Sequence, residues 1–235
     1  MINNNRILII IPAYNEEKNI VGVISQLSNI DVPVDYVVIN DCSKDRTKEV
    51  LDKNKIIHVD LPVNLGIGGA VQTGYLYAQK NGYDIAIQLD GDGQHDPNYI
   101  KNLIEPLIKD EADVVIGSRF IENEGFQSTL MRRVGIKFLS GLIKMVSGAK
   151  ILDVTSGFRA TNIKGVELFA NDYAQDYPEP EAIIVGSKAK LRTKEVPVVM
   201  KERNAGESSI SGFSSVYYML KVSLAILICG LRRNK

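Results

Sequence analysis

Short apolar runs rich in Val and Ile alternate with longer amphipathic segments through the first half of the chain. The apolar runs lie at residues 6–14, 35–41, 55–60, 83–90 and 112–119, and the segments between them have the length and spacing of helices. Continuous apolar strands separated by helices indicate a parallel sheet that is covered on both faces. The pattern therefore predicts an α/β fold built on a mostly parallel sheet.

The pattern changes after residue 120. A basic, helix-like segment at 129–148 precedes a polar loop at 153–160, further helical segments and a strand at 192–200. The apolar segment from Val216 to Leu231 is shorter than the roughly 20 residues that a membrane span requires. It fits either a core helix or a helix at a membrane interface, with a true span as the weakest alternative. We expect one domain over residues 1–212 and a C-terminal apolar and basic helix over 213–235.

Charge and cysteine content narrow the function classes. Lys plus Arg and Asp plus Glu both number 28, so the net charge is zero and nucleic acid is not an expected partner. Cys42 and Cys229 lie far apart without metal-ligand spacing, which fits a reducing compartment. The apolar run before Pro12 is too short for a signal peptide and is interpreted as the first strand.

Asp90 and Asp92 follow a buried strand, with Gly91 between them. Ligands of parallel α/β sheets collect at the carboxyl ends of the strands. Carboxylates there suit Mg²⁺ or Mn²⁺, because these hard cations take oxygen ligands and keep positions open for substrate phosphates. A calcium-binding helix-loop-helix motif is excluded, since His95 and Lys101 stand where it requires Gly and Glu. The spacing therefore predicts a divalent-cation site, beside which His95 either packs or forms hydrogen bonds.

Two further features belong to the same edge of the predicted sheet. The glycine-rich stretch at 64–69 fits either a phosphate at a helix N-terminus or close helix packing. Ser43 and Asp45, after the second strand, fit helix capping or a ligand role.

Seven sequence motifs resemble those of a known protein family. "IPAYNEE", "VINDCSKDRT", "NLGIGGA", "LDGDGQHDP", "GSRF", "TSGFRA" and "RNAGESSI" occur in an order and spacing that resemble glycosyltransferase family 2 with the GT-A fold, to about residue 210. They look most like the branch that includes dolichyl-phosphate mannosyltransferase and bacterial polyprenyl-phosphate glycosyltransferases. The resemblance implies an inverting, metal-dependent enzyme that moves a hexosyl unit from a UDP- or GDP-linked sugar to a polyprenyl phosphate, such as undecaprenyl phosphate, for cell-envelope glycan synthesis.

The resemblance also implies roles for individual residues. It assigns a Mg²⁺ or Mn²⁺ ion to Asp90, Asp92 and Gln94. Asn40 stands where many relatives have an aspartate, so only its neighbour Asp41 is carried over. The residues expected around the donor nucleotide are Pro12, Ala13, Tyr14, Glu16, Asp41, Asn64 and Gly68.

Charge bears on the nature of the acceptor. A lipid phosphate is already ionised and needs no general base, but it needs cations, and arginine pairs with phosphate through a planar fork. The resemblance places the acceptor phosphate on Arg119 and on Arg132 or Arg133, and the residues do not decide between the last two. The resemblance also places three further residues near the phosphates, namely Arg159, Arg203 and Ser208.

Two alternatives stay open at this point. The same fold could transfer sugar to a hydroxyl, in which case Glu181 is the expected base, or it could bind a nucleotide sugar without turnover. Ser209 stands where relatives often have Lys, which removes one positive charge near the expected phosphates. The expected location is peripheral, at the cytoplasmic face of the cell membrane, with a small membrane helper protein or a homo-oligomer as further expected partners.

Overall fold

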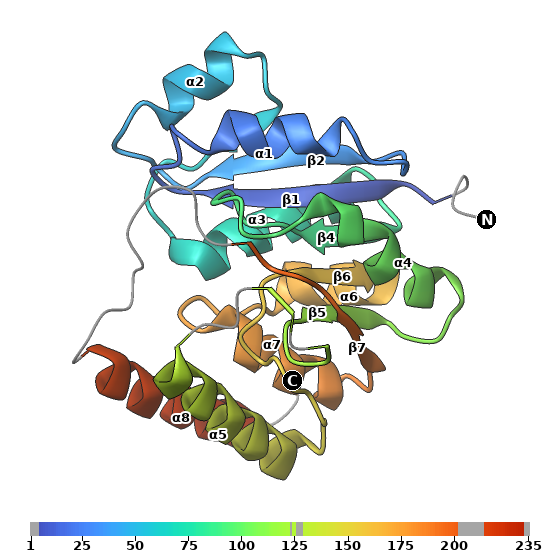
Figure 1. The fold of residues 1–235 in the computed structure, drawn as a ribbon, viewed down its shortest axis with the longest axis vertical. Coiled ribbons are helices and arrows are strands. Elements are labelled where there is room, and N and C mark those ends of the chain that lie inside the picture. The colour runs from blue at the N-terminus through green and yellow to red at the C-terminus, as the bar shows by residue number, and fades with distance from the viewer. Residues whose placement is uncertain (1–4, 123, 126–128, 202–213, 233–235) are drawn as a thin grey trace.

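The computed structural model describes residues 5–122, 124–125, 129–201 and 214–232. Within these ranges the strands form one sheet in the order β3-β2-β1-β4-β6-β5-β7, with helices on both faces (Figure 1). The strands are β1 (Ile7–Ala13), β2 (Asp35–Asn40), β3 (His58–Asp60), β4 (Ile85–Gln88), β5 (Val114–Ser118), β6 (Arg159–Asn162) and β7 (Thr193–Pro197). The helices are α1 (Ile20–Leu27), α2 (Thr47–Lys53), α3 (Gly66–Lys80), α4 (Ile100–Ile108), α5 (Leu130–Ser147), α6 (Ile163–Asn171), α7 (Pro178–Lys188) and α8 (Ser214–Leu231), with a 3₁₀ turn at Pro97–Tyr99.

The predicted mostly parallel sheet is confirmed. Strand β1 is buried at every position and pairs in parallel with β2 and β4, as its continuous apolar sequence requires. The exception is β6, which runs antiparallel between β4 and β5. Its sequence, Arg-Ala-Thr-Asn, has no apolar run, so the hydrophobic pattern could not reveal it.

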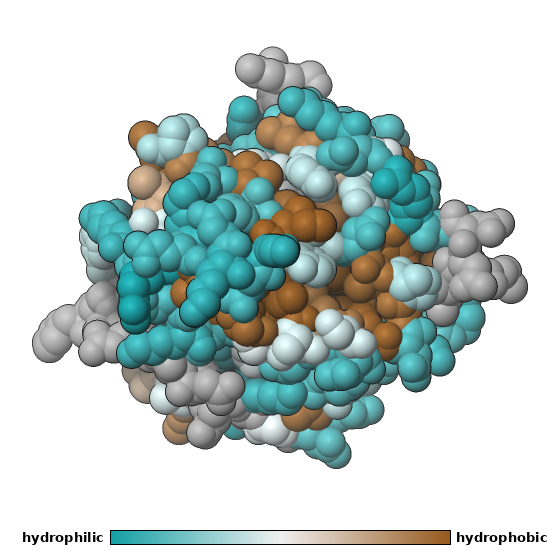
Figure 2. Space-filling model, turned by 90° about the horizontal axis from the view of Figure 1, so that it is seen from above, coloured by the Kyte–Doolittle hydropathy of each residue, from teal (hydrophilic) through white to brown (hydrophobic). Residues whose placement is uncertain are grey.

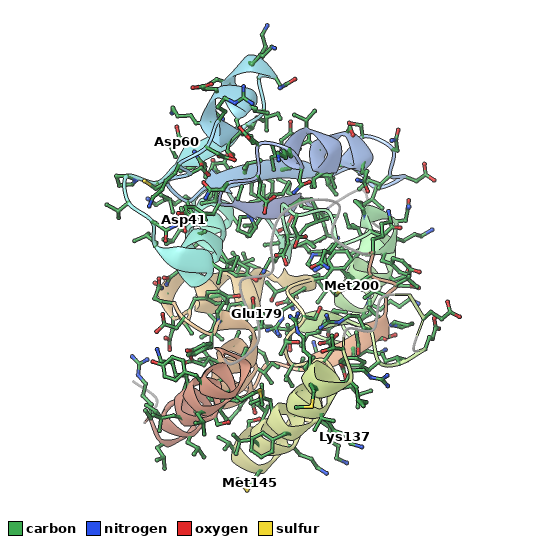
Figure 3. The ribbon with its side chains drawn as sticks, turned by 60° about the vertical axis from the view of Figure 1, so that its left-hand side comes forward. Asp41, Asp60, Lys137, Met145, Glu179 and Met200 are labelled. Atoms are coloured by element: carbon green, nitrogen blue, oxygen red, sulfur yellow. The ribbon has the colours of Figure 1, made fainter. Side chains whose placement is uncertain are left out.

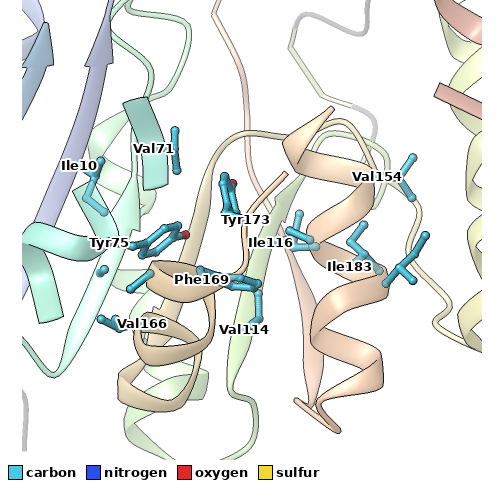
Figure 4. Packing of buried hydrophobic residues seen from close by; sticks show 14 of the residues in the cluster. Ile10, Val71, Tyr75, Val114, Ile116, Val154, Val166, Phe169, Tyr173 and Ile183 are labelled. Atoms are coloured by element: carbon cyan, nitrogen blue, oxygen red, sulfur yellow. The ribbon is translucent and has the colours of Figure 1, made fainter. Parts of the chain in front are cut away.

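Helix α3 packs directly on the sheet and on α6. A Cβ at Gly74 would lie 2.1 Å from the Ile10 side chain, so glycine is what allows α3 to approach β1. Tyr75, Phe169 and Tyr173 form an aromatic cluster with ring centroids 5.4 to 5.5 Å apart (Figure 4). This cluster fixes the chain that leads from α6 into α7.

Helix α8 packs against α5 and α7. Val222, Ile226 and Cys229 of α8 are buried in the same core as α3 and α6. Lys188 of α7 donates hydrogen bonds to the backbone carbonyls of Cys229 and Arg232, a favourable interaction at a helix C-terminus. Among the helices in the described ranges, none is both long and apolar enough to span a membrane.

Asp113 joins three strands at the amino-terminal end of β5. Its buried carboxylate accepts hydrogen bonds from Arg192 Nε at 2.9 Å, Asn162 Nδ2 at 2.9 Å and Lys164 Nζ at 3.1 Å. The Arg192 guanidinium, together with the other donors, holds the pKa of Asp113 well below its usual range. The ionised form therefore stabilises the folded state.

We expect Asp113→Asn to lower the free energy of unfolding at pH 7 by about 2 kcal/mol, because hydrogen bonds to a buried charge are lost. Because the pKa of Asp113 is lower in the folded than in the unfolded state, the ionised carboxylate stabilises the folded state at pH values above the unfolded pKa near 3.8. This contribution is lost as the pH falls through the lower pKa of the folded state. The difference between wild type and variant in urea unfolding should thus shrink between pH 7 and pH 3. A difference that is unchanged at pH 3 would contradict this. Glu105→Gln, at an exposed pair with Lys109, is the matched control and should show a much smaller effect.

Candidate active site

Loops at the carboxyl ends of β1, β2, β3 and β4 surround a pocket of about 520 Å³. This is the edge of the sheet that the strand pattern selected, because parallel strands bring these ends together. The size is within the range of small-molecule sites. The residues that line the pocket are Pro12, Ala13, Tyr14, Glu16, Asp41, Asn64, Gly66, Ile67, Ala70, Asp90, Gly91 and Asp92.

Asp90 and Asp92 both line this pocket. The Asp90 side chain is partly exposed, whereas Asp92 is buried and its Oδ1 accepts the Gln94 backbone N–H at 3.0 Å. The Gln94 side-chain amide instead points to the carbonyl of Lys201, and Gln94 is not among the lining residues. Within the described residues there is no group of three or more His, Cys, Asp or Glu side chains that could hold a metal. Two carboxylates and the open pocket beside them fit a cation that takes its remaining ligands from substrate and water.

The Asp90 carboxylate is surrounded by residues that hold it in place. Gln88 Nε2 donates to its Oδ1 at 3.2 Å. A Cβ added at Gly157 would lie 3.0 and 3.2 Å from the two Asp90 oxygens, so the 155–158 loop reaches the carboxylate because position 157 is glycine. His95 Nδ1 accepts the Asp90 backbone N–H at 3.1 Å. The sequence motifs did not reveal these roles of Gln88 and Gly157, although Gly157 belongs to one motif and Gln88 directly precedes another.

The first two loops are tied to each other. The backbone N–H of Glu16 donates to Thr47 Oγ1 at 2.8 Å, and that of Glu17 to Asp45 Oδ2 at 3.1 Å. Asp45 Oδ1 also accepts the Thr47 N–H at the start of α2. Asp45 therefore has the structural role that the sequence allowed for it, and it fixes the loop that contains Glu16.

Asp41 and Asn40 have different environments at the end of β2. Asp41 is 3% exposed, and its Oδ1 accepts the Leu65 N–H at 2.7 Å while its carbonyl accepts from Asn64. Asn40 Nδ2 donates to Asp60 Oδ1 at 2.7 Å, and Asn40 does not line the pocket. The structure thus places Asp41 at the pocket and uses Asn40 to connect β2 with β3.

Of the glycines in the 64–69 stretch, Gly66 lines the pocket, and its φ of 75° suits glycine. Gly68, which the sequence placed beside a phosphate, is instead buried against the segment between α6 and α7. A Cβ there would lie 2.1 Å from the Ala174 carbonyl oxygen and 2.4 Å from that of Gln175. Close helix packing, the structural alternative considered for this stretch, accounts for Gly68.

A second cavity, of about 370 Å³, lies along α5. It combines an apolar lining with the side chains of Arg133 and Lys137, and Arg132 does not contribute to it. The sequence did not single out Lys137, which is one helical turn from Arg133. The lining residues of this groove, called the α5 groove below, are Phe120, Leu130, Arg133, Val134, Ile136, Lys137, Ser140 and Leu152.

Arg119 and Arg159 are both buried and bound to protein groups. Arg119 Nε and Nη2 each lie 2.7 Å from an oxygen of Asp153, so its planar fork binds this carboxylate next to Phe120 of the α5 groove. Arg159 donates to the carbonyls of Ser156 and Glu179, both at 2.7 Å. Both arginines therefore hold the 153–158 loop, and neither lines the pocket or the groove.

Two carboxylates at the start of α7 differ in their surroundings. Burial raises the pKa of Glu179, while the nearby Arg159 opposes this and Asp90 adds to it. Burial also raises the pKa of Glu181, but its charged neighbours are two aspartates and Arg232 at the end of α8. Of the two, Glu179 is therefore the one that shares the electrostatic environment of Asp90. Arg203 and Ser208 lie outside the described residues.

A family model for "Glycosyl transferase family 2" matches residues 8–168, which include all four loops of the pocket. The chain belongs to glycosyltransferase family 2. It is 32% identical to UDP-N-acetylglucosamine–dolichyl-phosphate N-acetylglucosaminyltransferase of Methanococcus voltae, over 93% of this chain and 96% of the relative. It is 29% identical to undecaprenyl-phosphate mannosyltransferase of Micrococcus luteus, over 88% of each.

Solved structures confirm the GT-A fold of this family 2 glycosyltransferase. A glucosyl-3-phosphoglycerate synthase from Mycobacterium tuberculosis, in complex with Mn²⁺, UDP and phosphoglyceric acid, matches with a TM-score of 0.74. The match covers 99% of this chain and 81% of that structure at 21% identity, so the likeness concerns the fold.

Proposed function

We propose that this family 2 enzyme transfers a hexosyl unit from a UDP- or GDP-linked sugar to a polyprenyl phosphate, with inversion at the anomeric carbon. The proposal rests on two neighbouring features, the acidic pocket and the apolar, cationic α5 groove. One loop takes part in both. Leu152 lines the α5 groove, and Gly157, five residues later, lies so near Asp90 that a Cβ at position 157 would be 3.0 Å from its carboxylate. The relatives named for dolichyl-phosphate and undecaprenyl-phosphate transfer support the same acceptor class.

The pocket is the proposed donor site. Tyr14, Asp41 and Asn64 would contact the nucleoside, and Asp90 with Asp92 would hold Mg²⁺ or Mn²⁺ at the diphosphate. When bound, such a cation stabilises the negative charge that develops on the departing diphosphate. The protein's part is to keep the Asp90 carboxylate at the pocket wall, through Gln88, His95 and the nearby Gly157.

The α5 groove is the proposed acceptor site. A polyprenyl phosphate has an anionic head and an apolar tail, and the groove presents Arg133 and Lys137 among apolar side chains. The phosphate oxygen is the nucleophile and is already ionised, so the protein needs to orient it and to exclude water. Arg119 would support this site indirectly, because its ion pair with Asp153 fixes the loop behind Phe120 and Leu152.

The surface of α5 and α8 fits a membrane surface. Apolar side chains are exposed on both helices, among them Phe138 at 58%, Leu220 at 67% and Leu224 at 58%. Figure 3 shows Lys137 and Met145 along α5, at the end of the molecule opposite Asp60. Figure 2 views the molecule from above and so shows a different face, at the end away from α5 and α8, where hydrophilic side chains cover most of the rim. Contiguous exposed apolar residues with basic neighbours are typical of interfacial helices.

The function is tested by incubating the full chain with vesicles that contain polyprenyl phosphate and with UDP-glucose, UDP-N-acetylglucosamine or GDP-mannose in turn. We expect a glycolipid from one of these donors, its formation abolished by chelation and restored by Mn²⁺ or Mg²⁺. Asp92→Asn should lower turnover at least about 100-fold, since transition-state charge is then less stabilised. Donor hydrolysis without glycolipid, or transfer that persists in chelator, would contradict the proposal.

A pair of variants tests the acceptor site. Arg133→Ala should raise the KM for polyprenyl phosphate about tenfold or more, because a charge-assisted hydrogen bond to phosphate is lost. Arg132→Ala, its neighbour outside the groove lining, is the matched control and should change KM little. Equal effects of the two variants in initial-rate kinetics would refute this assignment of the groove.

A third test concerns the membrane. Replacing Leu220 and Leu224 together by Glu should reduce sedimentation with anionic vesicles about tenfold or more, because exposed apolar area and favourable charge are both lost. Ile57→Glu, at a similarly exposed apolar residue beside β3, should leave sedimentation unchanged. Undiminished vesicle binding by the double variant would show that α8 is not the contacting surface.

A further inference from the structure

We propose that His95 is a positioning residue that holds the Asp90 carboxylate in the orientation in which it accepts the cation. The inference rests on the proposed role of Asp90 as a metal ligand, and it adds a residue that the family assignment leaves without a function. His95 would therefore act through Asp90 and not as a ligand itself.

The His95 ring contacts Asp90 at two points. Nδ1 lies 3.1 Å from the Asp90 backbone nitrogen and accepts its hydrogen, so the hydrogen of the neutral ring is on Nε2. Nε2 in turn lies 3.7 Å from Oδ2 of the same aspartate. One side chain thus fixes the backbone of the loop and faces the carboxylate. Nδ1 cannot bind a metal while it accepts this hydrogen bond.

The ring itself is held by packing. His95 is 4% exposed and stacks on Phe158, with ring centroids 4.8 Å apart and planes 11° from parallel. Phe158 is also buried, and its carbonyl accepts the Gly117 N–H at 2.8 Å at the end of β5. The backbone of residue 95 also forms an isolated bridge with Met200. The ring therefore cannot rotate away from Asp90 without disturbing the core.

The carboxylate is consequently constrained on several sides. Gln88 donates to Oδ1, His95 Nε2 lies 3.7 Å from Oδ2, and the backbone at Gly157 leaves no room for a side chain between the 155–158 loop and the carboxylate. Residues that orient a metal ligand typically change metal affinity by roughly 10- to 100-fold when removed. A purely structural histidine would instead change stability and leave metal affinity as it was.

Three substitutions separate these roles. His95→Phe keeps a ring that can stack on Phe158 but removes both nitrogens. His95→Asn can place an amide oxygen near the position of Nδ1 and so accept the Asp90 N–H. His95→Gln extends its amide toward the position of Nε2 and does not restore the backbone contact.

The measurement is an equilibrium titration of the full-length chain with Mn²⁺, followed by electron paramagnetic resonance, at saturating UDP or GDP, whichever the wild type binds. We expect His95→Phe to weaken Mn²⁺ binding roughly 10- to 100-fold while the melting temperature without metal stays within a few degrees. His95→Asn should recover part of this loss, and more than His95→Gln does. If His95→Phe does not fold, the relative Mn²⁺ affinities of His95→Asn and His95→Gln decide between a positioning role and a purely structural one.

Asp90→Asn separates failure of this inference from failure of the proposed function. If Asp90→Asn binds Mn²⁺ as tightly as wild type, Asp90 is not a ligand and the metal site itself is wrong. If Asp90→Asn loses Mn²⁺ but His95→Phe binds it within twofold of wild type, the positioning role is overturned. Equal affinities of the Asn and Gln variants at position 95 would overturn it as well.

Discussion

Concentrated negative charge at the end of one buried strand is the constraint on which the site depends. Asp90 and Asp92 follow β4, and Glu179 lies close enough to Asp90 for their charges to interact. Like charges in a partly buried place repel and resist ionisation unless donors or cations compensate them. The fold supplies Gln88 as a donor to Asp90 and Arg159 as a buried cation near Glu179, and both aspartates line the pocket in which we propose that the metal binds.

The 152–158 loop connects the two halves of the proposed reaction. Its first residue, Leu152, forms part of the α5 groove, and Gly157 lies close to the Asp90 carboxylate. Arg119 and Arg159 hold this loop through Asp153 and the carbonyl of Ser156. Two arginines that the sequence suggests as phosphate ligands thus share a structural role, because both bind groups of the loop that lies between the pocket and the α5 groove.

Continuous apolar strands made most of the fold predictable, because buried parallel strands leave a strong pattern in the sequence. The loops at their carboxyl ends followed from the same pattern, which singled out Asp90 and Asp92, while the resemblance to the family supplied six further residues that line the pocket: Pro12, Ala13, Tyr14, Glu16, Asp41 and Asn64. Strand β6 was not predictable, since its four residues form a strand only between β4 and β5. The different roles of Gly66 and Gly68 and the choice between Arg132 and Arg133 also depend on neighbours far away in the chain, which a local motif does not contain.

The central claim is that a divalent cation binds between the paired aspartates and the donor diphosphate. A crystal structure of the chain with Mn²⁺ and its nucleotide sugar tests this most directly. We predict anomalous density for manganese within about 2.0 to 2.3 Å of oxygens of both Asp90 and Asp92 and of the diphosphate, with the nucleoside beside Asp41. A nucleotide bound elsewhere, or a metal that contacts neither carboxylate, would contradict the account.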